Sequence, residues 1–222
     1  MFTDQFKHAI RDYKYLLNRD YPQKATIKLV GDKYQLPGVE RSILYRGISG
    51  EDSAKKREAK KSECFEGERI LIDTYNILFT LANYLNGRPV FISDDNYVRD
   101  AGELRGRFSK KSFQEKTLKI VFDFLADKKE NEYLFFIDKP VSNSRGLTSS
   151  INELIKSNEL HGKAMIYDSP DFRIIQTACK NDLVCTSDSV IIEKVEAMIY
   201  DLSFALLSNN FDNKFVRLTD FL

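Results

Sequence analysis

The stretch "ERILIDTYNILFTL", residues 68–81, joins a short apolar run to the pattern of an amphipathic helix. Residues 70–72 are three consecutive Ile or Leu side chains, which is typical of a buried strand. Apolar residues then recur at helical spacing after Asn76, which predicts a helix over residues 74–86. Asp73 and Asn76 stand where the strand passes into the helix, so this junction is the first candidate for a site.

The alternation of strand and helix continues through the rest of the chain. Strands are predicted at "RILID", "RPVFIS", "YLFFID", "KAMIYD" and "DLVCTSD", with a further one at "KFVRL". Helices are predicted at residues 74–86, 113–128, 147–158, 171–180 and 189–196. Strands that alternate with helices require crossover connections. We therefore expect an α/β domain over residues 68–222, with a mostly parallel sheet flanked by helices.

Acidic residues follow most of these strands. Asp73, Asp138 and Asp188 lie at or just past the ends of three of them, and Asp94, Asp95 and Asp168 close others. The carboxyl ends of parallel strands share one edge of a sheet, where ligands bind. Gathered carboxylates repel one another unless a cation lies among them. The hard cations Mg²⁺ and Mn²⁺ prefer oxygen ligands, so either would suit this edge.

Each acid also has an ordinary structural interpretation. Asp73 and Asp188 precede predicted helices, and Asp is a favoured N-cap. Asp138 precedes Lys139 and Pro140, where it suits a turn. The run Asp94-Asp95-Asn96 is equally typical of a polar loop. The residues alone leave both interpretations open.

A separate helical module is predicted over residues 1–48. Three short amphipathic helices, with a Gly-containing turn between the last two, resemble a helix-turn-helix. The basic side chains placed to meet phosphates are Arg19, Lys24, Lys28, Lys33, Arg41 and Arg46. A packing or dimerisation module is the alternative. Residues 49–67 follow as a polar, charged connector, either a solvated helix or a flexible linker.

Composition narrows the class of protein. Residues 1–61 contain 14 Lys or Arg against 8 Asp or Glu, whereas the whole chain has a net charge of only +1, so a basic part precedes an acidic one. Three cysteines without CxxC spacing predict reduced thiols, and two distant histidines disfavour a zinc site or a Ser-His-Asp triad. No apolar run approaches the ~20 residues of a membrane span. With no signal-peptide pattern either, we expect a cytoplasmic protein without a membrane partner.

Several motifs are similar to those of known families. "ILIDTYNIL" resembles the first-strand motif of PIN-like nucleases, in particular the NYN branch. "LVCTSDSVI" resembles their late Thr-Ser-Asp motif, and "FFIDKPVSNS" falls where they carry a middle acid. Nearly the whole chain also resembles a two-domain family, with the domain of unknown function 434 followed by the PIN-like domain of unknown function 5616.

The resemblance implies roles for individual residues. Asp73, Asp138 and Asp188 would be ligands of Mg²⁺ or Mn²⁺, and Asn76 would support the first acid or a metal-bound water. The usual PIN acid on the helix between the first and later strands has no clear counterpart, so either Asp95 or Asp100 would substitute for it as a ligand, or the site would be impaired. Asp94 is a further reserve acid.

A basic segment follows the acids at residues 94 and 95. Residues 93–111 hold Arg99, Arg105, Arg107, Lys110 and Lys111, which would neutralise a phosphodiester backbone, unless the loop is simply solvated. We expect a metal-dependent nuclease whose helical module binds substrate, with RNA indicated by the resemblance alone. The alternatives are a non-catalytic nucleic-acid-binding or regulatory protein with a degenerate PIN-like domain, or a protein-interaction adaptor. The sequence permits a homo-oligomer.

Overall fold

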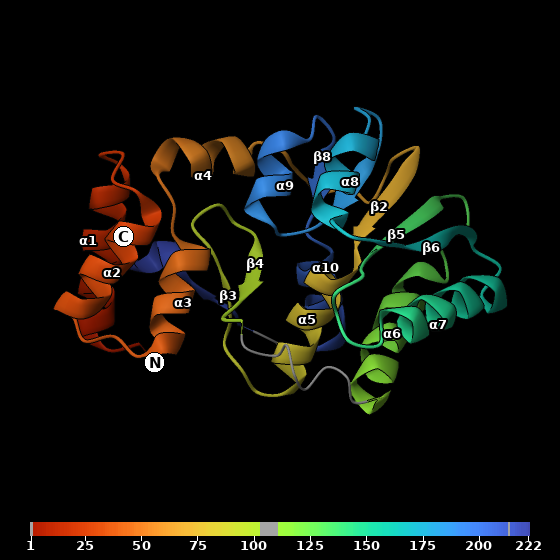
Figure 1. The fold of residues 1–222 in the computed structure, drawn as a ribbon, viewed down its shortest axis with the longest axis horizontal. Coiled ribbons are helices and arrows are strands. Elements are labelled where there is room, and N and C mark those ends of the chain that lie inside the picture. The colour runs from red at the N-terminus through yellow and green to blue at the C-terminus, as the bar shows by residue number, and fades with distance from the viewer. Residues whose placement is uncertain (1, 103–110, 213) are drawn as a thin grey trace. The chain divides into compact units, whose positions relative to one another are not determined.

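The computed structural model describes residues 2–102, 111–212 and 214–222. The chain forms two compact units (Figure 1), and each contains segments that are distant in sequence. The first unit comprises the described parts of residues 1–59, 83–103 and 214–222, and the second those of residues 60–82 and 104–213. The sequence suggested one division, at residues 49–67. The structure differs, because the chain enters the first unit three times.

The second unit is built on a parallel sheet. Its strands are β1 (Lys61–Ser62), β2 (Arg69–Asp73), β5 (Glu132–Asp138), β6 (His161–Tyr167), β7 (Leu183–Cys185) and β8 (Met198–Tyr200). They lie in the order β1-β8-β7-β2-β5-β6, and every described pair is parallel. Ile70, Leu71 and Ile72 are at most 1% exposed, because this central strand is covered on both faces. The mostly parallel sheet is thereby confirmed.

Helices cover both faces of this sheet (Figure 1). They are α5 (Thr74–Leu85), which begins in this unit, α6 (Lys111–Leu125), α7 (Ser144–Ser157), α8 (Pro170–Thr177), α9 (Ser189–Lys194) and α10 (Leu202–Asn210). Right-handed crossovers from β2 to β5 and from β5 to β6 place α6 and α7 on one face. The chain then returns across the sheet to β7, which places α8 on the other face, where it packs on β2 and β5. None of the helices in the described ranges is long and apolar enough to cross a membrane.

The first unit combines helices with a small sheet. Its helices are α1 (Asp4–Leu17), α2 (Gln23–Lys33), α3 (Gly38–Gly47) and α4 (Glu51–Glu58), with a 3-10 helix η1 (Leu218–Phe221). Its strands β3 (Val90–Ile92), β4 (Val98–Asp100) and β9 (Val216–Arg217) form a sheet in the order β4-β3-β9. The core joins these segments, since Phe6, Tyr13, Leu44, Phe91 and Leu218 are all at most 1% exposed. The three expected helices before residue 48 are present, and α4 shows that part of the connector is helical.

The prediction that "RPVFIS" belongs to the parallel sheet is wrong. Its strand, β3, pairs antiparallel with β4, with Phe91 opposite Arg99. The two strands are joined by a tight turn in which Ser93 N–H donates to the Tyr97 carbonyl and Asn96 adopts φ 63°. Only an antiparallel partner can follow so short a connection, because a parallel strand needs a crossover of about a dozen residues or more. The strand at "KFVRL" exists as β9 and also joins this small sheet.

Candidate functional site

Three acids stand at or just past the ends of adjacent parallel strands of the second unit. Asp73 ends β2, which is hydrogen-bonded to β5 on one side and β7 on the other. Asp138 ends β5 two residues beyond Phe136, the partner of Asp73, and so lies about 7 Å further along the strand direction. Asp188 follows β7 by three residues. The acids therefore share one edge of the sheet, as the sequence predicted, and their role as ligands stays a prediction.

Asp73 is the most deeply buried of these acids, at 6% exposure. The Thr186 hydroxyl donates to its Oδ2 at 2.7 Å, and the backbone N–H of Asn76 also hydrogen-bonds to it. Burial raises the pKa of Asp73 to about 8, and the negative charges of Asp171 and Asp188 add to the effect, while the Thr186 hydrogen bond opposes it. The carboxyl group is thus held mainly protonated at neutral pH in the absence of a cation.

Thr186 links two of the acids. Besides donating to Asp73, its hydroxyl oxygen accepts the backbone N–H of Asp188 at 3.0 Å. Asn76 fixes the same segment, because its Oδ1 accepts both the backbone N–H of Ser187 at 2.9 Å and the Ser187 hydroxyl at 3.0 Å. Thr186 and Ser187 were not predicted as site residues, although both belong to the Thr-Ser-Asp motif.

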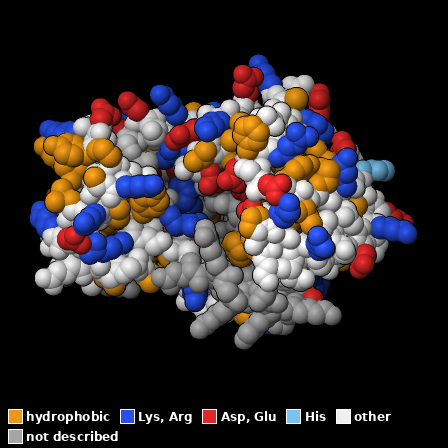
Figure 2. All heavy atoms as spheres, in the orientation of Figure 1, with side chains coloured by type: hydrophobic (Ala, Val, Ile, Leu, Met, Phe, Trp, Pro, Cys, Tyr) orange, Lys and Arg blue, Asp and Glu red, His pale blue; other side chains and the backbone are white. Residues whose placement is uncertain are grey.

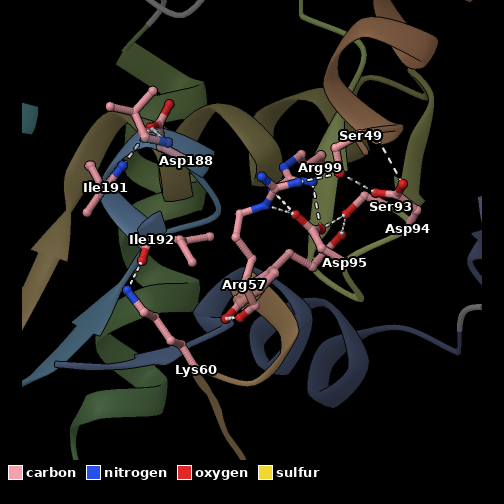
Figure 3. Close-up of polar contacts among 12 residues, drawn as sticks. Ser49, Arg57, Lys60, Ser93, Asp94, Asp95, Arg99, Asp188, Ile191 and Ile192 are labelled. Carbon is pink, nitrogen blue, oxygen red and sulfur yellow. Dashed lines mark hydrogen bonds and ion pairs between the residues drawn. The ribbon is translucent and has the colours of Figure 1, made fainter. Parts of the chain in front are cut away.

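Asp188 is also the N-cap of α9. Its Oδ1 accepts the backbone N–H groups of Val190 at 2.8 Å and Ile191 at 3.1 Å (Figure 3). The structural interpretation of this acid is therefore correct. Capping occupies Oδ1 alone, and no described residue donates to Oδ2, so Asp188 can cap the helix and still present one oxygen to a ligand.

A fourth acid, Asp171, belongs to the same group. It lies in the first turn of α8, and its pKa is raised because protein atoms partly shield it and because Asp188 and Asp138 are negatively charged. The strand-end pattern does not mark Asp171, since this residue follows no strand directly. A topological signal was available: the helix after a parallel strand begins at that strand's carboxyl edge. Asp168 lies apart from this group, exposed and paired with Lys139 at 2.8 Å.

The four residues Asp73, Asp138, Asp171 and Asp188 are here termed the acidic group. None of the described Lys, Arg or His side chains forms an ion pair with Asp73, Asp171 or Asp188. In the described chain, no three His, Cys, Asp or Glu side chains converge closely enough to chelate a metal directly. The available donors are all oxygens, which suits Mg²⁺ or Mn²⁺ and disfavours a thiolate-type zinc site. Mg²⁺ also retains several waters and can bind through one or two carboxylates.

Asp94, Asp95, Asp100 and Arg99 lie in the first unit instead. Asp95 is fully buried; Arg99 donates to its two oxygens at 2.7 and 2.8 Å, and Arg57 also donates to it (Figure 3). Burial acts to raise the pKa of Asp95, but the charges of Arg99 and Arg57 outweigh it and hold the pKa below its usual range.

The remaining acids of this unit are engaged as well. Asp94 accepts from Lys14 at 2.8 Å and from the Ser49 backbone, and Asp100 accepts from Gly102 N–H. Asp95 and Arg99 therefore stand on the hairpin of the small sheet and not at a strand end of the parallel sheet.

The predicted phosphate-binding residues divide into three classes. Arg41 is bound to Asp32 at 2.8 Å, and Arg46 lies 3.7 Å from Asp100. Lys24 and Lys28 are exposed and make no ion pair with a described acid. The third class, Arg105, Arg107 and Lys110, lies outside the described residues.

Comparison with known proteins shows the family to which the chain belongs. Residues 62–203 match the model of a domain of unknown function, DUF5616. The chain belongs to the DUF5616 family. Residues 5–60 match a protein of unknown function, DUF434, so this member carries both domains in the expected order.

One curated protein is similar to most of the chain. An uncharacterized protein, MJ0935, of Methanocaldococcus jannaschii is 30% identical over 189 residues, which cover 83% of this chain and 88% of that protein. No solved structure matches the chain significantly. The DUF5616 match includes the β3–β4 hairpin, which the structure places in the first unit, so the family boundary and the compact unit do not coincide.

Proposed function

We propose that the chain is a nuclease dependent on Mg²⁺ or Mn²⁺, with RNA as its substrate. The observation that carries the proposal is the acidic group itself. Four carboxyl groups from two strand ends, one loop and one helix influence one another electrostatically at the carboxyl edge of a parallel sheet. Three of the four have no cationic partner among the described residues. Such repulsion is costly unless the site binds a cation.

The residues around the acids have distinct parts in this proposal. A cation held by one or two of the carboxylates of Asp73, Asp138 and Asp188, with waters as its other ligands, would supply an activated water and neutralise charge on a scissile phosphate. Thr186 orients the Asp73 carboxyl group and at the same time holds the backbone of Asp188. Asn76 holds Ser187, which lies between Thr186 and Asp188 in the sequence.

Cation binding by Asp73 would be coupled to the release of a proton. With a pKa of about 8 it must lose a proton when it becomes a ligand, so cation binding and proton release are coupled. We therefore expect cation affinity to rise with pH as pH approaches 8.

The choice of RNA depends on the resemblance of "ILIDTYNIL" to NYN-type nucleases. The basic residues of the first unit support a polyanionic substrate in general terms. They do not distinguish RNA from DNA, so both polymers belong in the test.

The test is a cleavage assay on the full chain with end-labelled single-stranded RNA and DNA. We expect cleavage with Mg²⁺ or Mn²⁺ that ceases in EDTA. Asp73→Asn, Asp138→Asn and Asp188→Asn should each reduce the rate at least ~100-fold, since each removes a charge from the cation site. Asp168→Asn is the matched control, because Asp168 lies near a strand end but is paired with Lys139. Retained metal-dependent cleavage in all three site variants would reject the assignment. Binding without cleavage by the wild type would favour the non-catalytic alternative.

A further inference from the structure

The helices of the first unit expose three tyrosines. Tyr15 on α1, Tyr21 just before α2 and Tyr45 on α3 are 54%, 53% and 39% exposed. Aromatic side chains usually bury most of their surface, so several exposed rings on one small unit are informative. All three lie outside the core of this unit, which is formed by residues such as Phe6 and Tyr13.

The three rings belong to neighbouring segments. The Tyr21 backbone N–H donates to the Leu16 carbonyl at 3.2 Å, which places Tyr21 beside the end of α1 that also carries Tyr15. The Gln23 side chain donates to the Tyr45 carbonyl at 2.8 Å, which places the end of α3 beside the start of α2. The three tyrosines therefore belong to segments that meet near the start of α2.

Unpaired cations belong to the same segments. The Arg19 guanidinium stacks over the Tyr15 ring, 3.9 Å from its centroid. Lys24 and Lys28 are one turn apart on α2 and project from the same side of the helix. Arg19, Lys24 and Lys28 form no ion pair with any acid in the described ranges.

Other basic side chains nearby are neutralised within the unit. Lys33 is paired with Asp12, and Arg41 is paired with Asp32. Figure 2 shows hydrophobic and basic side chains interspersed over α1–α3, on the face that it presents. Arg19, Lys24 and Lys28 therefore keep their positive charge available to a ligand.

We propose that Tyr15, Tyr21, Tyr45, Arg19, Lys24 and Lys28, the tyrosine surface, bind single-stranded nucleic acid by stacking unpaired bases on the rings. The proposal deepens the proposed function by naming the form of its substrate. Successive bases stack on aromatic side chains in sequence-tolerant single-strand binding, while cations follow the phosphates. A duplex would offer the cations its phosphates, but its bases are already stacked and unavailable to the tyrosines. An acidic protein would also use the cations, so competition by a polyanion without bases is one arm of the test.

The test measures binding in EDTA, where cleavage cannot occur. A fluorescent 12-nucleotide single-stranded RNA and its duplex are titrated with the full chain, and anisotropy gives the Kd. Tyr21→Ala and Tyr45→Ala should each weaken single-strand binding between about 5-fold and 100-fold, the range expected for one lost stacking contact. Tyr21→Phe and Tyr45→Phe retain the ring and should bind like the wild type. Phe204→Ala removes an exposed aromatic of the second unit and is the matched control.

Further arms separate stacking from general charge attraction. Lys24→Gln should lower the salt dependence of binding and weaken duplex and single strand alike, because it removes a phosphate contact. Polyglutamate should compete poorly with RNA, because it supplies negative charge but no bases to stack on the tyrosines. The inference is overturned if the Tyr→Ala variants bind within twofold of the wild type, if the duplex binds as tightly, if polyglutamate displaces RNA efficiently, or if no RNA binds.

The outcome is independent of catalysis. Tyrosine-dependent binding by a protein that never cleaves would uphold this inference and reject the nuclease. Metal-dependent cleavage with unchanged binding in the Tyr→Ala variants would do the reverse. Because the three tyrosines are exposed, circular dichroism of each variant should match the wild type.

Discussion

Replacing Asp73 with Asn should change how stability depends on pH. Asn keeps an oxygen that accepts the Thr186 hydroxyl, so the substitution removes little besides the titrating group. The pKa of Asp73 is about 8 in the folded chain, against about 3.9 when unfolded. Between these values the folded state holds a proton that the unfolded state releases. Wild-type stability should therefore fall as pH rises towards 8, by about 1.4 kcal/mol per pH unit, and level off above it.

The assay is urea unfolding of wild type and variant at pH 5, 6, 7 and 8 in EDTA, followed by circular dichroism. Titrations of other groups are common to both proteins and cancel in the difference. Between pH 5 and pH 8 the variant should gain on the order of 4 kcal/mol relative to the wild type. Asp168→Asn, the matched control, should run parallel to the wild type, because its partner Lys139 lies on the surface. A constant difference between Asp73→Asn and wild type at all four pH values would refute the raised pKa of Asp73, and with it the coupling of cation binding to proton release.

Three further predictions concern the ion pairs of Asp95, the helix cap formed by Asp188, and the binding of Mg²⁺. Asp95→Ala should destabilise the protein by about 3–5 kcal/mol in urea unfolding, because Arg57 and Arg99 would remain buried without their partner; a change below 1 kcal/mol would contradict this. Asp188→Ala should cost about 0.5–2 kcal/mol through loss of the α9 cap, whereas Asp188→Asn should keep most of that stability and still lose cleavage; equal cleavage by the Asn variant and the wild type would leave Asp188 as a cap alone. Mg²⁺ should raise the thermal midpoint of the wild type more at pH 8 than at pH 6, since the proton on Asp73 competes with it; an equal rise at both pH values would argue against Asp73 as a ligand.

The parallel sheet could be predicted because its strands carry strong local signals. Ile70–Ile72 and the run at residues 133–137 are continuous apolar segments, each followed by an acid. Helices between them then fix the connection type and bring the strand ends to one edge. For this reason three members of the acidic group could be chosen from the sequence.

Other features depend on contacts that local patterns do not contain. β3 has the composition of a buried strand, and only its tight turn to β4 separates it from the parallel sheet. β8 has three residues, too few for a periodic pattern, and was missed. Arg57 and Asp95 are 38 residues apart in sequence, so their ion pair could not be inferred from spacing. Asp171 could be identified as a member of the acidic group only from the topology of α8, because no sequence motif marks it.

The most direct test of the central claim is the anomalous density of a crystal soaked in Mn²⁺. We expect a peak at the carboxyl edge of β7, β2 and β5, within coordination distance of oxygens from Asp73 and at least one of Asp138, Asp171 and Asp188. The peak should be absent from crystals of Asp73→Asn, whose fold should otherwise be unchanged. A well-ordered crystal that takes up Mn²⁺ elsewhere, or not at all at saturating concentration and pH 8, would contradict the proposal that this acidic group is a cation site.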